Sequence, residues 1–140
     1  MKKLTVTKAK TLADKYFSRF IRLRDSLLFG KYGWCKCCSC GKVDEIKNMD
    51  AGHWINRKAN ITRYDETNAH SQCQHCNRFQ EGNASGYARF MLAEYGSEHM
   101  DDLDELHWQL KQFKAIELKE IADEYRLKVK TIEKEHGKVW

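Results

Sequence analysis

The 140-residue sequence contains no proline, no internal repeat and no long apolar run. Because proline interrupts helices more strongly than any other residue, its absence leaves the helical patterns along the chain unbroken. No apolar stretch reaches the roughly 18 residues that would suggest a membrane span. With 41% hydrophobic and 32% charged residues, we expect a soluble, helix-rich protein of one domain, or one small domain with a helical extension.

The N-terminus also lacks an apolar secretory leader, so we expect a reducing compartment. All six cysteines fall in two short clusters. Cysteines grouped in this way are too close together to staple distant segments, which makes three disulfides less favoured than a metal site. Burial of the cysteines as small apolar side chains is the other alternative.

The two clusters contain two Cys-x-x-Cys pairs, a pattern typical of a structural zinc site. Such a site needs four soft ligands at tetrahedral geometry, and two knuckles of two cysteines provide them without strain. The expected ligands are Cys37, Cys40, Cys73 and Cys76. Because the core around them would be small, we expect the metal to contribute folding free energy as well as shape.

The first cluster also allows a second register, in which Cys35 pairs with Cys38. We favour Cys37 with Cys40, because Gly41 follows directly and permits the tight turn of a zinc knuckle. Cys35 and Cys38 are then spare thiols.

The net charge of +5 is unevenly distributed. Residues 1–36 contain ten Lys and Arg but two Asp, a net charge of +8, so the other 104 residues carry −3. The acidic residues gather between positions 98 and 124. A positive charge concentrated at one end of the chain indicates a polyanionic partner there.

Helical periodicity predicts a helix over residues 7–29, ended by Gly30. Its apolar positions recur at spacings of three and four: Leu12, Tyr16, Phe20, Leu23 and Leu27. The same helix carries a basic stripe of Lys8, Lys15, Arg19 and Arg22. This stripe is either an ordinary solvated face or a set of phosphate contacts.

Two strand-like runs, residues 43–46 and 51–55, are expected to pair as a hairpin around the first knuckle. The polar stretch 56–67 is expected to be irregular, and the second knuckle should open a short helix over residues 76–80. A ligand-bearing hairpin followed by a ligand-bearing helix is the ββα arrangement that metal-dependent nucleases use.

Three further helices are expected in the rest of the chain. The first begins at Asn83 or Ser85 and ends at Gly96, the second spans residues 100–110, and the third spans residues 115–136. The last helix has an apolar seam of Leu118, Ile121, Tyr125, Val129 and Ile132. Such a seam is more typical of packing within the chain than of a dimer contact, although a homodimer through it would suit a symmetric substrate.

The segment between the knuckles has groups suited to phosphodiester hydrolysis, which needs a base, a cation and a group that aims the base. His53 is the best base because imidazole titrates near pH 6.5, and the preceding Gly52 would let the backbone approach a substrate closely. We expect the amide of Asn68 to hold the imidazole by a hydrogen bond.

A catalytic cation would bind oxygen ligands near that base. Asn77 is adjacent to a zinc-bound cysteine and hence rigidly placed, so it could bind Mg²⁺ with Asp50 as the carboxylate partner. His70 is an alternative ligand. Taken alone, each histidine would more often be structural, but the convergence of these groups between two knuckles favours a catalytic site.

Five stretches carry a resemblance to a known family: residues 37–41, 50–53, 63–70, 72–77 and 82–83. In them the chain resembles the NinG/Rap recombination endonucleases of lambdoid phages, members of the wider HNH, or His-Me finger, nuclease superfamily. The resemblance also takes in residues 16–25 and the helical tail, so it covers most of the chain.

The resemblance implies an α+β, helix-rich fold with a zinc-clamped ββα-metal core of the HNH type over residues 33–96. This core would lie between a basic N-terminal helix (residues 1–32) and a C-terminal helical extension (residues 97–140), within a single compact domain. The implied activity is cleavage of branched DNA, such as Holliday junctions and D-loops, with Mg²⁺ or Mn²⁺. It would take place in the cytoplasm of a bacterial host.

Within the family motif, His53 matches the base, Asn68 the central asparagine and Asn77 the metal-binding last position. Gly52 stands where the superfamily often has a metal-binding His or Asp, which leaves Asp50 as the candidate second ligand. The candidate DNA contacts are Lys8, Lys15, Arg19, Arg22, Arg57 and Arg63. A zinc-ordered DNA-binding accessory module that does not cut, or a zinc-stabilised protein-interaction domain, are the alternative functions.

Overall fold

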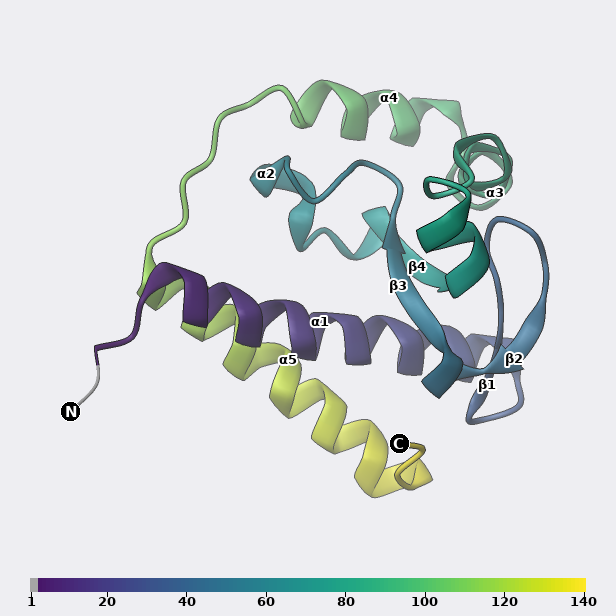
Figure 1. Ribbon diagram of the computed structural model, residues 1–140, viewed down its shortest axis with the longest axis horizontal. Coiled ribbons are helices and arrows are strands. Elements are labelled where there is room, and N and C mark those ends of the chain that lie inside the picture. The colour runs from purple at the N-terminus through teal and green to yellow at the C-terminus, as the bar shows by residue number, and fades with distance from the viewer. Residues whose placement is uncertain (1–2) are drawn as a thin grey trace.

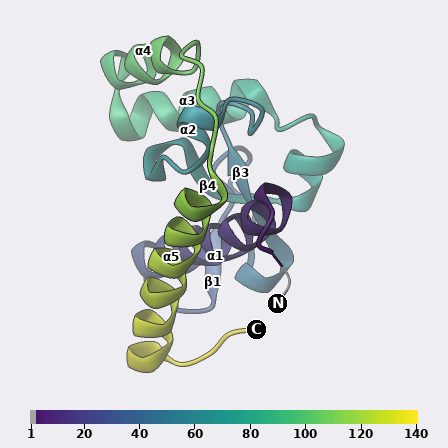
Figure 2. The same ribbon diagram turned by 90° about the vertical axis from the view of Figure 1, so that its left-hand side faces the viewer.

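The computed structural model describes residues 3–140 as a helix-rich α+β protein with two small sheets (Figure 1). Its helices and strands are α1 (Val6–Phe29), β1 (Trp34–Lys36), β2 (Val43–Glu45), β3 (Met49–His53), α2 (Asn60–Arg63), β4 (Ala69–Cys73), α3 (Ala84–Tyr95), α4 (Ser97–Leu106) and α5 (Ala115–His136). Short 3₁₀ turns precede β3 and β4, and a π-type turn, His75–Phe79, follows β4. Figures 1 and 2 show α1 at the centre, with α5 on one side, the β3–β4 pair on the other, and α3 and α4 beyond it.

Helix α1 begins and ends close to where its sequence predicts. The Thr5 hydroxyl accepts a hydrogen bond from the Lys8 amide at 3.2 Å, and Gly30 ends the helix with a left-handed φ of 91°. The predicted apolar stripe is wrong in part, because Leu12 and Leu27 are exposed. The fully buried positions include Ala9, Ala13, Phe17 and Ile21. Since α1 is covered by α5 and by the β3–β4 pair, it buries more than one stripe.

The predicted hairpin of residues 43–46 with 51–55 is wrong. Strand β2 pairs antiparallel with β1 across the first cysteine cluster, and β3 pairs antiparallel with β4, from Met49 opposite Cys73 to His53 opposite Ala69. Both β1 and β4 lead into cysteine pairs that converge in space. The sulfur cluster therefore joins the two small sheets, a long-range constraint that local strand propensity does not contain.

The segments around β4 are more ordered than expected. Residues 56–67, predicted as irregular, contain α2 and part of the 3₁₀ turn Glu66–Asn68. The short helix predicted over residues 76–80 is the π-type turn His75–Phe79. Together, the β3–β4 pair and this turn place polar residues of the segment between the two cysteine pairs beside α1.

The three C-terminal helices confirm most of the predicted limits. Asn83 caps α3 by accepting a hydrogen bond from the Gly86 amide, and Gly96 ends it. Helix α4 begins at Ser97, before the predicted start at Met100, and ends at Leu106, so the expected extension to Leu110 is wrong. Leu110 lies beyond the helix and is fully exposed. Helix α5 has the predicted bounds and ends at Gly137.

The apolar seam of α5 packs within the chain. Leu118, Tyr125 and Val129 are buried, and they contact clusters that include α1 residues. The interpretation as intramolecular packing is confirmed, because α1 covers this seam. The homodimer stays a prediction, and it would need a surface other than these buried positions. Across residues 3–140, no helix combines the length and apolar character needed to cross a membrane.

Candidate functional site

Four cysteines from three segments converge in the structure. Cys37 and Cys40 lie between β1 and β2, Cys73 ends β4, and Cys76 lies in the π-type turn. All four sulfurs fall within 4.8 Å of one another, and those of Cys40 and Cys73 are 3.7 Å apart. In a tetrahedral zinc site with bonds of about 2.3 Å, neighbouring sulfurs lie about 3.8 Å apart. The cluster could hold a metal ion, and its donor set fits zinc.

Backbone turns and amides support the cluster. Gly41 adopts a φ of 82° and its amide donates to the Cys37 carbonyl at 3.0 Å, which closes the first knuckle. The Cys76 amide donates to the Cys73 sulfur at 3.4 Å, and the Asn83 side chain donates to the Cys76 sulfur at 3.5 Å. Donors directed at sulfur stabilise thiolates, the form that binds zinc.

The other register of the first cluster is not used. Cys35 and Cys38 lie outside the four-sulfur cluster and line a separate cavity of about 280 Å³. Burial raises the pKa of Cys35 to about 11, so this thiol stays protonated at neutral pH. The preferred register, Cys37 with Cys40, is confirmed.

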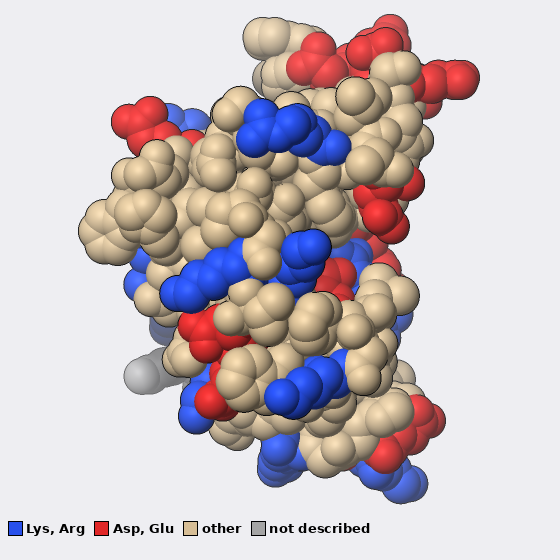
Figure 3. Space-filling model, turned by 90° about the vertical axis from the view of Figure 1, so that its right-hand side faces the viewer, with Lys and Arg blue, Asp and Glu red and all other residues tan. Residues whose placement is uncertain are grey.

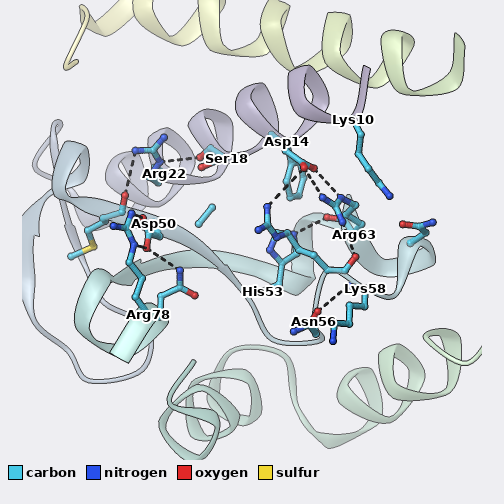
Figure 4. Close-up of a pocket in the computed structure, with 16 residues that line it drawn as sticks. Lys10, Asp14, Ser18, Arg22, Asp50, His53, Asn56, Lys58, Arg63 and Arg78 are labelled. Atoms are coloured by element: carbon cyan, nitrogen blue, oxygen red, sulfur yellow. Dashed lines mark hydrogen bonds and ion pairs between the residues drawn. The ribbon is translucent and has the colours of Figure 1, made fainter. Parts of the chain in front are cut away.

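A larger cleft, of about 920 Å³, opens between α1, β3 and residues 56–63. Two carboxylates, Asp14 and Asp50, line it, and His53 lies near its middle (Figure 4). Its cationic side chains are Lys10, Arg22, Arg57, Lys58, Arg63 and Arg78. Six cations against two carboxylates give the lining a formal net charge of +4, which suits an anionic ligand.

His53 is held in one tautomer. Its Nε2 lies 2.8 Å from the carbonyl oxygen of Arg63. Since a carbonyl can only accept, Nε2 carries the proton and Nδ1 keeps its lone pair. Burial lowers the pKa of His53 to about 4. The imidazole is therefore neutral at neutral pH, the state that a general base requires.

The expected hydrogen bond between Asn68 and His53 is wrong. Asn68 is fully buried, and its amide donates to the carbonyls of Ile55 and Thr62, both at 3.1 Å, while accepting from the Ile55 amide at 2.9 Å. It thus fastens both ends of the loop between β3 and α2. Arg63, whose carbonyl receives the His53 hydrogen bond, directly follows Thr62, so Asn68 supports the position of His53 indirectly.

Asp14 of α1 is a residue of the cleft that the sequence analysis missed. Its carboxylate accepts two hydrogen bonds from the Arg63 guanidinium, at 2.9 and 2.5 Å, and one from the Tyr64 hydroxyl at 2.8 Å. Burial acts to raise the pKa of Asp14, but the Arg63 and Tyr64 hydrogen bonds outweigh it and lower the pKa. The one available signal was that Asp14 is among two acidic residues in the strongly basic first 36.

The structure brings Asp50 and Asn77 together as expected. The Asn77 amide nitrogen donates to Asp50 at 2.9 Å, and Arg78 binds both carboxylate oxygens, at 2.9 and 2.8 Å. A carboxylate beside an amide is an oxygen donor set that fits Mg²⁺ or Mn²⁺. A cation at Asp50 would have to compete with Arg78, which the sequence analysis did not identify.

The proposal of His70 as an alternative ligand is wrong. His70 lies opposite Gly52 on β4 and is turned toward α3. The Tyr87 hydroxyl donates to the Gly52 carbonyl at 2.6 Å, so it accepts from His70 Nδ1 at 3.0 Å, and His70 Nε2 accepts from Tyr95 at 2.6 Å. Both ring nitrogens are occupied, and burial lowers the pKa of His70 to about 3.

The role expected for Gly52 is also wrong. A Cβ atom at this position would lie 1.9 Å from Oε1 of Gln72, the cross-strand neighbour of Asp50. The missing side chain therefore makes room for Gln72 and not for a substrate.

The six predicted DNA contacts divide into two groups. Arg22, Arg57 and Arg63 line the cleft, whereas Lys8, Lys15 and Arg19 do not. Arg63 is committed to Asp14, and Arg22 donates to the carbonyls of Ile46 and Met49. The cleft adds Lys10, Lys58 and Arg78, which the sequence analysis did not select as DNA contacts.

The described residues thus define a helix-rich α+β protein in which a four-cysteine cluster able to hold a metal ion adjoins a basic cleft. The sequence profile described as "Bacteriophage Lambda NinG protein" matches residues 1–135. The chain therefore belongs to the NinG family, as its motifs indicated.

Curated relatives agree with this assignment. Protein ninG of Escherichia phage lambda is 31% identical over 125 residues, covering 86% of this chain and 55% of that protein. The ninG protein of Escherichia phage 933W is 32% identical over 112 residues, covering 76% and 52%, and that of Salmonella phage P22 is 31% identical over 125 residues. The chain spans about half the length of the curated relatives it matches. No solved structure matches it.

Proposed function

We propose that this chain is a metal-dependent DNA endonuclease of the HNH type. Its substrates would be branched recombination intermediates, such as Holliday junctions and D-loops, in the cytoplasm of a bacterial host. The observation that carries the proposal is His53, a neutral imidazole fixed at Nε2 with the lone pair of Nδ1 available, in a cleft of net charge +4.

In this proposal Nδ1 of His53 takes a proton from water as the water oxygen attacks phosphorus. The bond from phosphorus to the leaving oxygen breaks, and that oxygen is protonated from solvent. Mg²⁺ or Mn²⁺ held by Asp50 and Asn77 would stabilise the negative charge that develops on the phosphate. Arg57 would bind a flanking phosphate through paired N–H groups, and Lys10 and Lys58 would bind phosphates through their ammonium groups.

The cysteine cluster would orient this site without entering the reaction. Asn77 directly follows Cys76. Strand β3 pairs with β4, and β4 ends at Cys73. A zinc ion on the four sulfurs would therefore fix the π-type turn relative to β3, which ends at His53. This arrangement would set the distance between His53 and the oxygen donors Asp50 and Asn77.

A non-catalytic DNA-binding accessory module is the second candidate function. It is favoured by the pairing of Asp50 with Arg78, since both carboxylate oxygens are already satisfied by a guanidinium. Such a pair neutralises a carboxylate in a protein that needs no catalytic cation.

In the deciding experiment, the zinc-loaded protein is incubated with labelled linear duplex or four-way-junction DNA. Each substrate is tested separately with Mg²⁺, Mn²⁺ and EDTA. We expect cation-dependent cutting of the junction. His53→Ala should lower the rate by about 10²-fold or more while junction affinity and zinc content stay unchanged, because a general base acts in the chemical step.

His136→Ala serves as the matched control, since His136 lies on α5 away from the cleft. Cutting by His53→Ala at the wild-type rate would refute this active site. Tight junction binding by the wild type, without cutting under any cation, would establish the accessory module instead.

A further inference from the structure

The carboxylate of Asp50 is surrounded by donors from the π-type turn. Asn77 contributes one N–H and Arg78 contributes two, so that both carboxylate oxygens are bound (Figure 4). Asn77 and Arg78 directly follow Cys76, a residue of the four-sulfur cluster. The partners of Asp50 are therefore presented by a turn that the metal cluster can hold in place.

The two arginines near Asp50 differ in how firmly they are held. Arg22 donates to the carbonyls of Ser18, Ile46 and Met49, and the Trp140 ring lies 4.7 Å from its guanidinium carbon. The Arg78 side chain is 55% exposed, and within residues 3–140 its side-chain hydrogen bonds all go to Asp50. Of the two, Arg78 is the arginine that can move.

Arg78 and a divalent cation need the same oxygens. Asp50 is 18% exposed at the cleft and is the carboxylate nearest to Asn77. Rotating the Asn77 amide by half a turn would exchange its N–H for the oxygen that a cation prefers. The Arg78 guanidinium and a divalent cation cannot both bind the Asp50 carboxylate, because two positive groups repel each other at such a short distance.

We propose that Arg78 competes with a divalent cation for Asp50, and that cation binding releases the guanidinium to the phosphates of DNA in the same cleft. The proposal rests on the proposed function, since it uses the same cation site. The Arg78 side of this pair is 55% exposed, and solvent screening limits the strength of the pair, so a cation that adds an amide ligand can displace Arg78. Arg78 would then be a phosphate-binding residue only when the cation is in place.

The first test measures Mn²⁺ binding by electron paramagnetic resonance, with the zinc-loaded 140-residue chain and no DNA. Arg78→Ala should bind Mn²⁺ about three- to tenfold more tightly than the wild type, because the competing pair is lost. Arg78→Lys should lie between the two, since it keeps the charge but loses the paired N–H geometry. Asp50→Asn should abolish this binding.

Arg89→Ala is the matched control. Arg89 is exposed on α3 and does not line the cleft, so its loss changes the net charge by the same amount without touching Asp50. Unchanged or weaker Mn²⁺ binding in Arg78→Ala, or an equal gain in Arg89→Ala, would overturn the competition.

The second test measures junction affinity in a His53→Ala background, with and without Mn²⁺. Arg78→Ala should lower the affinity severalfold with Mn²⁺ and much less without it, since Asp50 holds the guanidinium when no cation does. An equal loss under both conditions would overturn the release. If Mn²⁺ binds but Arg78→Ala changes nothing, only this inference fails. If the wild type binds no Mn²⁺ at Asp50, the metal-dependent part of the proposed function fails with it.

Discussion

The single hydrogen bond from His53 to the Arg63 carbonyl determines which nitrogen can act as a base. Because the carbonyl takes the Nε2 proton and burial opposes protonation, the neutral imidazole persists down to a pKa of about 4. An exposed histidine would be half protonated near pH 6.5. The hydrogen bond thus fixes the tautomer, and burial widens the pH range in which His53 is neutral.

This leads to a prediction for the pH dependence of cleavage. A lowered pKa keeps the base neutral as the pH falls, so kcat/KM should show no His53 titration between pH 7.5 and about 5. Rates at saturating cation, with zinc content measured at each pH, provide the check. A tenfold loss per pH unit beginning near pH 6.5 would show that His53 is solvated and not held as described.

Asp14 binds Arg63, whose carbonyl holds His53, so the proposed mechanism makes Asp14 a positioning residue. Asp14→Asn should weaken the pair with Arg63 and loosen the carbonyl that orients His53, lowering kcat by about tenfold with little change in KM. Asp44→Asn, at an aspartate of β2 outside the cleft, should leave kcat unchanged.

The double variant separates positioning from a merely structural role. If Asp14 works through His53, then Asp14→Asn should cause no further loss in the His53→Ala background. Full additivity of the two losses would contradict the link.

Among the structural elements, the β3–β4 pair requires a residue without a side chain at Gly52. Gly52→Ala would force a methyl group against Gln72, whose amide is anchored to the Ser39 hydroxyl and the Gly82 carbonyl. Overpacking of this kind costs about 1–3 kcal/mol, and urea unfolding of the zinc-loaded protein measures it.

Shortening the neighbour tests the cause. Gln72→Ala in the Gly52→Ala background should remove the steric conflict and cost less than the two single changes together. If Gly52→Ala were as stable as the wild type, the two strands would have to move apart enough to fit the methyl group at no cost in the free energy of unfolding.

The helices could be predicted from the sequence because their signals are local. Asn83 and Gly96 directly flank α3, and Gly137 directly follows α5, so each signal lies next to the helix that it limits. Strand β4 gave no such signal. All five of its residues are buried, yet its sequence Ala-His-Ser-Gln-Cys is largely polar. Its burial depends on distant partners, such as the two tyrosines that bind His70.

The same distinction separates the site residues that were found from those that were missed. His53, Asp50 and Asn77 were selected because their side chains suit hydrolysis and lie near the cysteine motifs. Asp14 and Arg78 take their importance from contacts with Arg63 and Asp50, which exist only once α1 and the π-type turn are placed. Their chemistry alone resembles that of any surface ion pair.

For the whole molecule, the cysteine cluster connects three segments of the chain, and Cys37, Cys73 and Cys76 pack in the same core as Leu23 and Met49. We predict one tightly bound Zn²⁺ per chain. Cys73→Ser or chelation should unfold the central region, because zinc binding free energy is also folding free energy. Metal analysis and circular dichroism measure the two effects.

Cys38→Ser is the control, since Cys38 lies outside the cluster and should keep the zinc. Full zinc retention in a Cys37→Ser, Cys40→Ser double variant would exclude this ligand set.

Charge is also organised over the whole molecule. Figure 3 shows a group of acidic side chains at the end where α4 lies, whereas Lys and Arg mixed with other acidic side chains extend over the rest of that face. Helix α4 contributes Glu98, Asp101, Asp102, Asp104 and Glu105. The acidic end would repel DNA and the cleft would attract it, so the field favours one orientation of a polyanion.

The last prediction concerns which cations contact DNA. Replacing the three cleft residues Lys10, Arg57 and Lys58 by Ala should flatten the dependence of log K on log salt by about 0.9 for each lost phosphate contact, or about 2.7 in all. Replacing Lys8, Lys15 and Arg19 removes the same charge from α1 outside the cleft, and should change the slope much less. Salt titrations of both triple variants on one duplex measure the difference. Because the net charges are identical, equal slopes would assign DNA binding to the general field of the protein, whereas a larger change for the α1 variant would return the interface to the basic stripe.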